Sequence, residues 1–463
     1  MYASLSWVPR GHLRACPTIY HPSREDEQKA KRVLQEMREA MTEEQESDSD
    51  IDNMSDVLDS EEKDEPAPHF NDKYVVVREE SDCDDEQLED FKLINSDNML
   101  VGARTMDLSY IDCLVYNSET NDFYLHHNMI SGVMPLSVVY FDFVPQGDGA
   151  AGNYCAISGF SSEIEIWDLD VLDAIAPVAV LGGTQVVTLR PKGPGFPKRK
   201  KEFPLPGSHK DHILSLAWSS LHRNILASAS ADMSIKIWDL NKLTCLYTFE
   251  GLHSNGPISS IAFHPTHPGI LASVGLGDRR IVLIQASSGQ TAEEIVRLEA
   301  DPEQLAWLGE DLLCCTTELG EICVISVVSR AIVCVARPLE EVSVGKQTPL
   351  TALSCHPTIP YILAVGSPEN THVALCQYTS EAREIRVLTV RDVSLPVFSL
   401  AWCGGQEAHA LALGSNQSRT RVLQPFSWLE YSLLTSLGVP EAYGTHKECV
   451  AKIIEDDLDD SDD

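Results

Sequence analysis

Short runs in which apolar and polar residues alternate recur between residues 91 and 427. Such runs predict strands, because successive side chains on a strand point to opposite faces. Seven of them end successive units of the chain: "CLVYN" (113–117), "IEIWDL" (164–169), "IKIWDL" (235–240), "IVLIQA" (281–286), "ICVISV" (322–327), "VALCQY" (373–378) and "TRVLQP" (420–425). Each follows a segment of small residues and a polar turn, which is typical of strands joined by tight hairpins. Gly, Pro, Asn and Asp interrupt the runs too often for helices.

Two pairs of similar segments within the chain give the length of the repeated unit. "IAFHPTHPGILASVG" and "LSCHPTIPYILAVGS" place His264 and His356 92 residues apart, which is two periods of 46. Blades of a propeller, each built from four short strands, repeat at about 40–45 residues, so this period fits. The two Ile-Trp-Asp-Leu segments place Trp167 and Trp238 71 residues apart, 25 more than one period, so an insertion must separate them. We assign it to the basic, proline-rich stretch 184–206.

The sequence therefore predicts an all-β fold, a seven-bladed β-propeller over residues 91–427 with 184–206 as an insertion loop. Closing the ring leaves only short, protected strand edges.

One unit, residues 205–250, contains polar side chains that must form hydrogen bonds with one another if they are buried. A buried tryptophan N–H requires an acceptor and a buried carboxylate requires donors. The spacing of His209, Ser228, Asp232 and Trp238 resembles the WD-repeat family, in which these four residue types form a hydrogen-bonded chain across strands. We expect a structural role for this tetrad. Elsewhere the pattern is incomplete, since Trp167 lacks the turn aspartate.

A further departure lies in the next unit, where Leu283 occupies the position expected for tryptophan. Such blades should depend more on apolar packing.

Longer stretches of the first 300 residues resemble one family within the WD-repeat proteins. "SDNMLVGART", "YNSETNDFYLHHNMI", "PLSVVYFDF", "GNYCAISGF" and "HILSLAWSSLHRNILASASADMSIKIWD" are similar to the periodic tryptophan protein family, as is the N-terminal "SWVPRGHL". The resemblance implies a nuclear and nucleolar assembly factor of the large ribosomal subunit that acts in pre-rRNA processing. Its implied partners are pre-60S assembly factors, basic ribosomal proteins and pre-rRNA, with ties to histones and chromatin in some members.

The net charge of −35 is concentrated in two segments of the 463-residue chain. Residues 42–90 contain 21 Asp and Glu against three Lys and Arg, and "EDDLDDSDD" at 455–463 adds seven acids. Segments that repel themselves and offer few apolar groups for burial are expected to stay disordered. The acidic arm 42–90 is either a solubilising segment or a polyanion that attracts basic partners. The second acidic segment ends a C-terminal extension, 428–463.

Residues 23–41, which follow an N-terminal segment 1–22, predict an amphipathic helix. Ser23 and Asp26 form a capping box, and Ala30, Val33, Leu34, Met37 and Met41 lie on one face. This face either packs on the propeller or docks on another assembly factor.

The insertion carries a basic cluster, Lys198, Arg199, Lys200 and Lys201, on what we expect to be an exposed loop. The cluster is a candidate nuclear localisation signal, with contact to RNA phosphates or simple solvation as alternatives.

The acidic arm contains three candidate phosphorylation sites. Ser47, Ser49 and Ser81 each have an acidic residue three positions downstream, as a kinase of the casein-kinase-two type requires.

No sequence motif points to catalysis, a cofactor or a metal. A Gly-rich phosphate loop, a nucleophile elbow and H-E-x-x-H are all absent, and His126-His127 has no further ligand at a suitable spacing. The 13 cysteines, without a C-x-x-C pair, favour a reducing compartment, and no apolar run predicts a membrane span. We therefore expect a non-catalytic scaffold in nucleolar ribosome biogenesis. The alternatives are a chromatin or histone-binding adapter and a ubiquitin-ligase substrate receptor.

Overall fold

The computed structural model describes residues 1–20, 91–189, 199–287, 292–342, 347–416, 419–444 and 449–450. Residues Met1–Ile19 and those from Leu93 onward form one compact unit. The predicted helix 23–41, the acidic arm 42–90 with its three serines, and the acidic tail lie outside the described residues.

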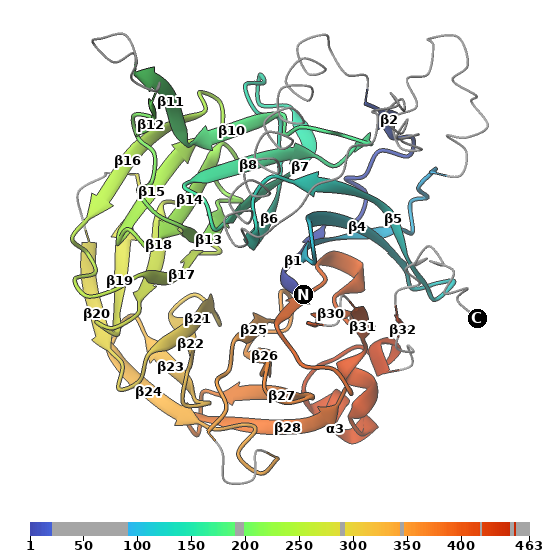
Figure 1. Ribbon diagram of the computed structural model, residues 1–463. Coiled ribbons are helices and arrows are strands. Elements are labelled where there is room, and N and C mark those ends of the chain that lie inside the picture. Colours follow the sequence, from blue (N-terminus) through green and yellow to red (C-terminus); the bar gives the residue numbers. More distant parts are fainter. Residues whose placement is uncertain are drawn as a thin grey trace, which may run out of the picture. The chain divides into compact units, whose positions relative to one another are not determined.

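Seven four-stranded antiparallel sheets surround a common axis as the blades of a propeller (Figure 1). From the innermost strand outward, blade 1 consists of β1 (Tyr2–Val8), β3 (Asn98–Thr105), β4 (Ser109–Asn117) and β5 (Asp122–Ser131). In the same order, blade 2 consists of β6 (Pro135–Phe143), β7 (Ala151–Gly159), β8 (Glu163–Asp168) and β10 (Ala179–Gly182). Blade 3 consists of β13 (Ile213–Trp218), β14 (Ile225–Ser230), β15 (Ser234–Asp239) and β16 (Thr244–Glu250). Blade 4 consists of β17 (Ile258–Phe263), β18 (Ile270–Gly275), β19 (Arg280–Gln285) and β20 (Ala292–Arg297). Blade 5 consists of β21 (Pro302–Trp307), β22 (Leu312–Thr317), β23 (Ile322–Ser326) and β24 (Ala331–Ala336). Blade 6 consists of β25 (Ala352–Cys355), β26 (Ile362–Gly366), β27 (His372–Thr379) and β28 (Glu384–Asp392). Blade 7 is β29 (Ser399–Trp402), β30 (Leu411–Gly414), β31 (Thr420–Leu423) and β32 (Cys449–Val450).

The predicted seven-bladed fold is confirmed, and each of the seven predicted runs overlaps the third strand of a blade. These strands are apolar because blades stack on both of their faces; β15, for example, is buried along its whole length. Among the described residues, one buried apolar cluster fills each of the seven interfaces between adjacent blades. Between blades 2 and 3, Trp238 and Leu216 pack with Phe141 and Ile164.

The ring closes through β1, which lies outside the predicted range 91–427. β1 pairs antiparallel with β3, with Trp7 opposite Leu100, and forms the innermost strand of blade 1. Its Trp7 indole N–H donates to Ala401 O of blade 7 at 2.9 Å. The N-terminal segment is therefore part of the propeller and not a preceding segment, because blade 1 lacks an inner strand without it.

The C-terminal boundary of the prediction also changes. The 3-10 helices η1 (Gly405–Glu407), η2 (Pro425–Trp428) and η3 (Glu441–Gly444) and the helix α3 (Tyr431–Ser436) all belong to the connections of blade 7. β32 then returns to pair with β31, so residues up to Val450 complete a blade and do not form a separate extension.

The segment expected before the first blade is instead inserted between β1 and β3, within blade 1. Its two ends are fixed to the ring at neighbouring points. β2 (Thr18–Ile19) pairs in parallel with β9 (Val171–Leu172) of blade 2, and Leu93 N–H donates to Ala15 O at 3.0 Å. The insertion thus leaves and re-enters the propeller at one place.

A side chain on each inner strand bonds to the neighbouring inner strand. Six of these seven side chains accept a backbone N–H from the next blade: Ser6 from Tyr140, Ser137 from Leu216, Ser215 from Ile261, Ser260 from Leu305, Gln304 from Leu353 and Ser354 from Trp402, at 2.7–3.3 Å. The seventh, Ser399, donates its hydroxyl to Tyr2 O at 3.2 Å. This circuit, which we call the hub, satisfies backbone groups that the antiparallel ladders leave free at the centre of the ring.

The predicted insertion loop contains a hairpin. β11 (Thr184–Leu189) pairs antiparallel with β12 (Arg199–Pro204) in a two-stranded sheet that is separate from the blades and projects from the ring (Figure 1). The sequence interpretation as a loop was wrong for these strands, because the Pro and Gly residues on which it rested gather in the connection between them.

Candidate functional site

The tetrad residues of blade 3 lie in one hydrogen-bonded chain. Trp238 Nε1–H donates to Ser228 Oγ at 2.8 Å, and Ser228 Oγ lies 2.7 Å from His209 Nε2. His209 Nδ1 lies 3.0 Å from Asp232 Oδ2, and the other carboxylate oxygen, Oδ1, accepts the Ser234 hydroxyl at 2.6 Å. The chain joins the loop before β13 to β14, β15 and the turn between those two strands.

The geometry fixes the direction of every proton in this chain. Since the Ser228 hydroxyl accepts from Trp238, its own proton points to His209 Nε2, and His209 carries its proton on Nδ1 toward Asp232. Burial lowers the pKa of His209 and outweighs the opposing effect of Asp232, so the imidazole is neutral at pH 7. Burial alone would raise the pKa of Asp232, but hydrogen bonds from His209, Ser234 and the Lys210 N–H together hold it below its usual range.

His209, Ser228 and Asp232 also reproduce the connectivity of a hydrolytic Ser-His-Asp triad. Two facts exclude that chemistry here. His209 and Ser228 are fully buried, so no substrate carbonyl can reach the hydroxyl oxygen. In addition, that oxygen already accepts the Trp238 N–H, which lowers its nucleophilicity. The tetrad connects β14, β15 and the turn between them to the loop before β13.

Blade 4 contains a related triad that sequence reasoning missed. His253 Nε2 lies 3.0 Å from Ser273 Oγ, and His253 Nδ1 lies 3.3 Å from Asp278. The signal was the His-Ser-Asp order, repeated one period after the tetrad. The strand pairing also corrects the position expected for tryptophan. In blade 3, Trp238 lies two residues after the strand partner of Ser228. Ser273 pairs with Val282, so the equivalent position in blade 4 is held by Ile284 and not by Leu283.

The error has a simple origin. Trp238 follows Ser228 by ten residues, but the turn of blade 4 is one residue longer, so the same count from Ser273 ends one position early.

Blade 2 replaces the missing aspartate in another way. Trp167 Nε1–H donates to the Glu165 carboxylate at 3.0 Å, and the same oxygen accepts the Ser131 hydroxyl at 2.7 Å. A carboxylate on the same strand therefore satisfies the buried indole.

The two His-Pro-Thr segments form equivalent links between blades. His356 Nε2–H donates to Ala408 O of blade 7 at 2.8 Å, while its Nδ1 accepts the backbone N–H groups of Thr358 and Ile359. Trp402 of blade 7 lies against the imidazole, with ring centroids 4.7 Å apart. Burial lowers the pKa of His356 to about 4, so the neutral ring is the form that makes these contacts.

His264 repeats the arrangement between blades 4 and 5. Its Nε2–H donates to Glu310 O at 2.7 Å, and its ring contacts Trp307 at 4.2 Å.

The other predicted sites lie on other elements or outside the described residues. Arg199, Lys200 and Lys201 lie on β12, whereas Lys198 and the candidate phosphorylation sites Ser47, Ser49 and Ser81 lie outside the described residues. His126 and His127 lie within β5, with their Nδ1 atoms 2.7 Å apart, and burial lowers the pKa of His127 to about 3.

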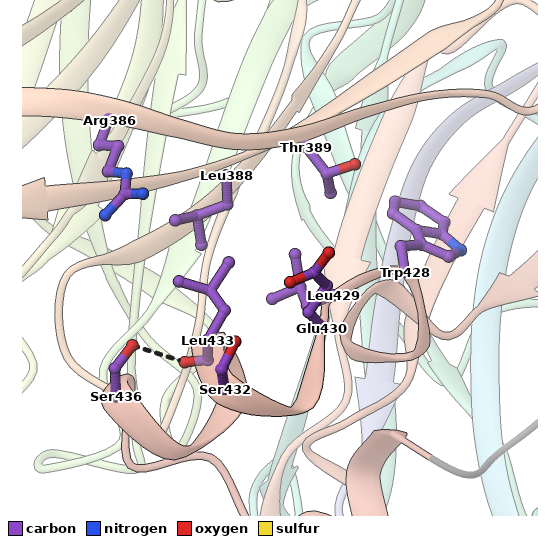
Figure 2. A pocket seen from close by; sticks show the side chains of 9 residues that line it. All are labelled: Arg386, Leu388, Thr389, Trp428, Leu429, Glu430, Ser432, Leu433 and Ser436. Carbon is purple, nitrogen blue, oxygen red and sulfur yellow. Dashed lines mark hydrogen bonds between the residues drawn. The ribbon is translucent and has the colours of Figure 1, made fainter.

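A groove of about 420 Å³ opens where β28 of blade 6 meets η2 and α3 (Figure 2). Leu388, Leu429 and Leu433 form much of its wall, and Arg386 and Glu430 are its charged residues.

Among the described residues, no group of three or more His, Cys, Asp or Glu side chains is arranged to bind a metal ion. The 12 described cysteines are free thiols. Within the same parts of the chain, no helix has the length and apolar character needed to span a membrane.

Known proteins share parts of this chain. The family "WD domain, G-beta repeat" matches residues 200–239, which include the first three strands of blade 3, and residues 243–284, which include the outer strand of blade 3 and the first three strands of blade 4. Periodic tryptophan protein 1 of Saccharomyces cerevisiae is 29% identical over 293 residues, 54% of this chain and 49% of that protein. Its Drosophila melanogaster homologue is 30% identical over 48% of this chain and 46% of that protein. These matches make the chain similar to the periodic tryptophan protein 1 family of WD-repeat proteins.

The curated relatives are matched over about half their length or less. An uncharacterised WD repeat-containing protein of Schizosaccharomyces pombe, for example, is 36% identical over 38% of this chain and 34% of its own. The crystal structure of the RRP9 WD40 repeats covers 70% of this chain and 84% of that chain, with a TM-score of 0.51 and 14% identity, and so supports the fold alone. Among the described residues, this relative of periodic tryptophan protein 1 has one complete tetrad and uses other polar links in the neighbouring blades.

Proposed function

We propose that this protein is a non-catalytic WD-repeat scaffold in nucleolar ribosome biogenesis, with a role in large-subunit assembly and pre-rRNA processing. The observation that carries the proposal is the similarity of the chain to periodic tryptophan protein 1 of yeast and its Drosophila homologue. The geometry supports the non-catalytic part, because the triad-like serines of blades 3 and 4, Ser228 and Ser273, are both fully buried, and Ser228 also accepts the Trp238 N–H. Its partners on this proposal are pre-60S assembly factors, basic ribosomal proteins and pre-rRNA, and the protein resides in the nucleus and nucleolus.

The acidic balance of the chain favours one further candidate, a chromatin or histone-binding adapter. A net charge of −35 attracts any strongly basic protein, histones included. A third candidate function for a scaffold propeller is that of a ubiquitin-ligase substrate receptor.

Co-purification of the tagged full chain from nuclear extract, with and without ribonuclease, separates these candidates. Large-subunit precursors in the bound fraction, together with accumulation of large-subunit pre-rRNA intermediates after depletion of the protein, are the expected results. Nucleosomes without ribosomal precursors would favour the adapter, and cullin adaptors would favour the ligase receptor. Either of these outcomes, with normal pre-rRNA, refutes the ribosomal proposal.

A further inference from the structure

Large apolar side chains are exposed on one end of the ring over blades 1 to 3. All but Ile130, which lies near the end of β5, are on the turns between second and third strands or on the link from blade 1 to blade 2. We call this set the tip surface: Met106, Leu108, Ile130, Met134, Phe160 and Met233, each 42–55% exposed. In the described parts of blades 4 to 7, the equivalent turns expose no large apolar side chain. The asymmetry shows that apolar tips are not a general requirement of the fold.

The tip surface is continuous from blade to blade. Ile130 pairs with Tyr110, two residues beyond Leu108, at the end of the blade 1 sheet. Phe160 N–H donates to Met134 O at 3.0 Å, which joins the turn of blade 2 to the link. The Phe160 ring meets the edge of His212 at 5.0 Å, so the turn of blade 2 touches the loop that enters blade 3.

From that loop, a backbone hydrogen bond continues to the Met233 turn, since Ala231 N–H donates to His212 O at 2.9 Å. Exposed apolar side chains that are contiguous and not scattered mark an interaction site.

The charges around this surface are predominantly negative. Asp107 and Asp211 are exposed, and Glu163 is partly exposed at the seam of blades 2 and 3. The neighbouring Lys210 already faces Glu250 at 3.5 Å. Carboxylates around an apolar patch repel the phosphates of a nucleic acid and attract Lys and Arg.

We propose that the tip surface binds an amphipathic segment of a partner protein, in which Lys or Arg residues flank a row of apolar side chains. Methionine side chains are flexible and fill irregular gaps, which suits a surface that receives such a segment. Asp107, Glu163 and Asp211 orient the segment by pairing with its basic flanks. The inference rests on this surface and stands whether or not the partner is a ribosomal one.

The test uses the full chain and a fluorescein-labelled peptide of 18 residues that forms a leucine and lysine amphipathic helix. Binding is followed by fluorescence anisotropy, and hydrogen exchange reports which turns the peptide protects. The variant Leu108→Ser/Met134→Ser/Phe160→Ser removes three exposed apolar side chains of the tip surface. Val328→Ser/Val335→Ser/Val387→Ser is the matched control, because it removes three exposed valines on strands and turns outside that surface.

The expected result is peptide protection of the turns at residues 105–109 and 159–163, and a Kd that rises roughly tenfold or more in the tip variant but not in the valine control. Melting midpoints verify that both variants fold. A peptide with glutamate in place of lysine should bind more weakly, as should the lysine peptide to Asp107→Asn/Glu163→Gln/Asp211→Asn. Because the acidic arm also attracts lysine peptides, equal binding by the wild-type chain and the tip variant, or an absence of protection at the turns, overturns the proposal. Equal binding of the two peptides overturns the basic character assigned to the partner.

Discussion

Removal of the Asp232 carboxylate provides the sharpest test of how the tetrad stabilises the ring. In Asp232→Ala, His209 Nδ1–H loses its acceptor at 3.0 Å while the imidazole remains fully buried. The N–H of Lys210, which also donates to Asp232, is at the surface and can bond to water instead. The penalty therefore comes from His209.

A buried donor without a partner costs about 1–3 kcal/mol. Ser234 reduces this penalty, because its hydroxyl oxygen lies 3.2 Å from His209 Nδ1 and can accept the proton once Asp232 is gone. We thus expect Asp232→Ala to lower the free energy of unfolding by roughly 1–2 kcal/mol. Ser234→Ala should cost more in the Asp232→Ala background than in the wild type, since it then removes the substitute acceptor.

Urea unfolding of the four proteins of this cycle gives the coupling energy, and hydrogen exchange of β14 and β15 localises the effect. Asp211→Ala is the matched control, because its side chain is about half exposed and accepts only the adjacent His212 N–H. It should change stability by less than about 0.5 kcal/mol. If Asp232→Ala unfolds at the same urea concentration as Asp211→Ala, the chain from Trp238 to Asp232 does not stabilise the fold.

The remaining predictions concern import, regulation and pH. Replacement of Lys198, Arg199, Lys200 and Lys201 by alanine should move a tagged protein out of the nucleus, and nuclear concentration of the variant would show that import uses another signal. Phosphorylation of Ser47, Ser49 and Ser81 by a kinase of the casein-kinase-two type should add about 1.5–2 negative charges per site and tighten salt-sensitive binding of basic peptides, as mass and affinity measurements would reveal. Because burial holds the pKa of His356 at about 4, below the 6.5 of an exposed histidine, the unfolded chain takes up a proton first as the pH falls. The contribution of neutral His356, up to about 3 kcal/mol, is present above pH 6.5 and is lost toward pH 4. Urea unfolding at stepped pH should give a shallower decline for His356→Gln, and an unchanged slope would contradict the assignment.

Local pattern was sufficient to predict the seven third strands, because each is a short apolar run bounded by turn residues. The tetrad was identified through the resemblance of its spacing to the WD-repeat family. Local pattern could not place β1, since the partners of that strand in blades 1 and 7 lie about 90 and 400 residues away in sequence. Nothing in "YASLSWV" itself distinguishes an inner strand of a distant sheet from an N-terminal segment.

The hairpin β11–β12 and Ile284 show two other limits of pattern reading. Turn residues between two strands of a protruding hairpin make the whole stretch look irregular. A turn one residue longer shifts every later position, and only the strand pairing reveals it.

The closing role of β1 has a consequence for the order in which the chain is made. Residues 2–8 are made long before their neighbours on β29, which begin only at Ser399, so a nascent chain carries β1 without its blade 7 neighbour through most of the synthesis of the propeller. β1 can pair with β3 early, but its apolar side chains that face blade 7 stay uncovered, and uncovered apolar surface on a partly made chain promotes association with other chains. A product truncated before β29 retains the fully buried Tyr2 and its neighbours without the blade that covers them. From the position of this one strand, we expect the chain to depend on chaperones during translation and its shortened products to be cleared by the cell.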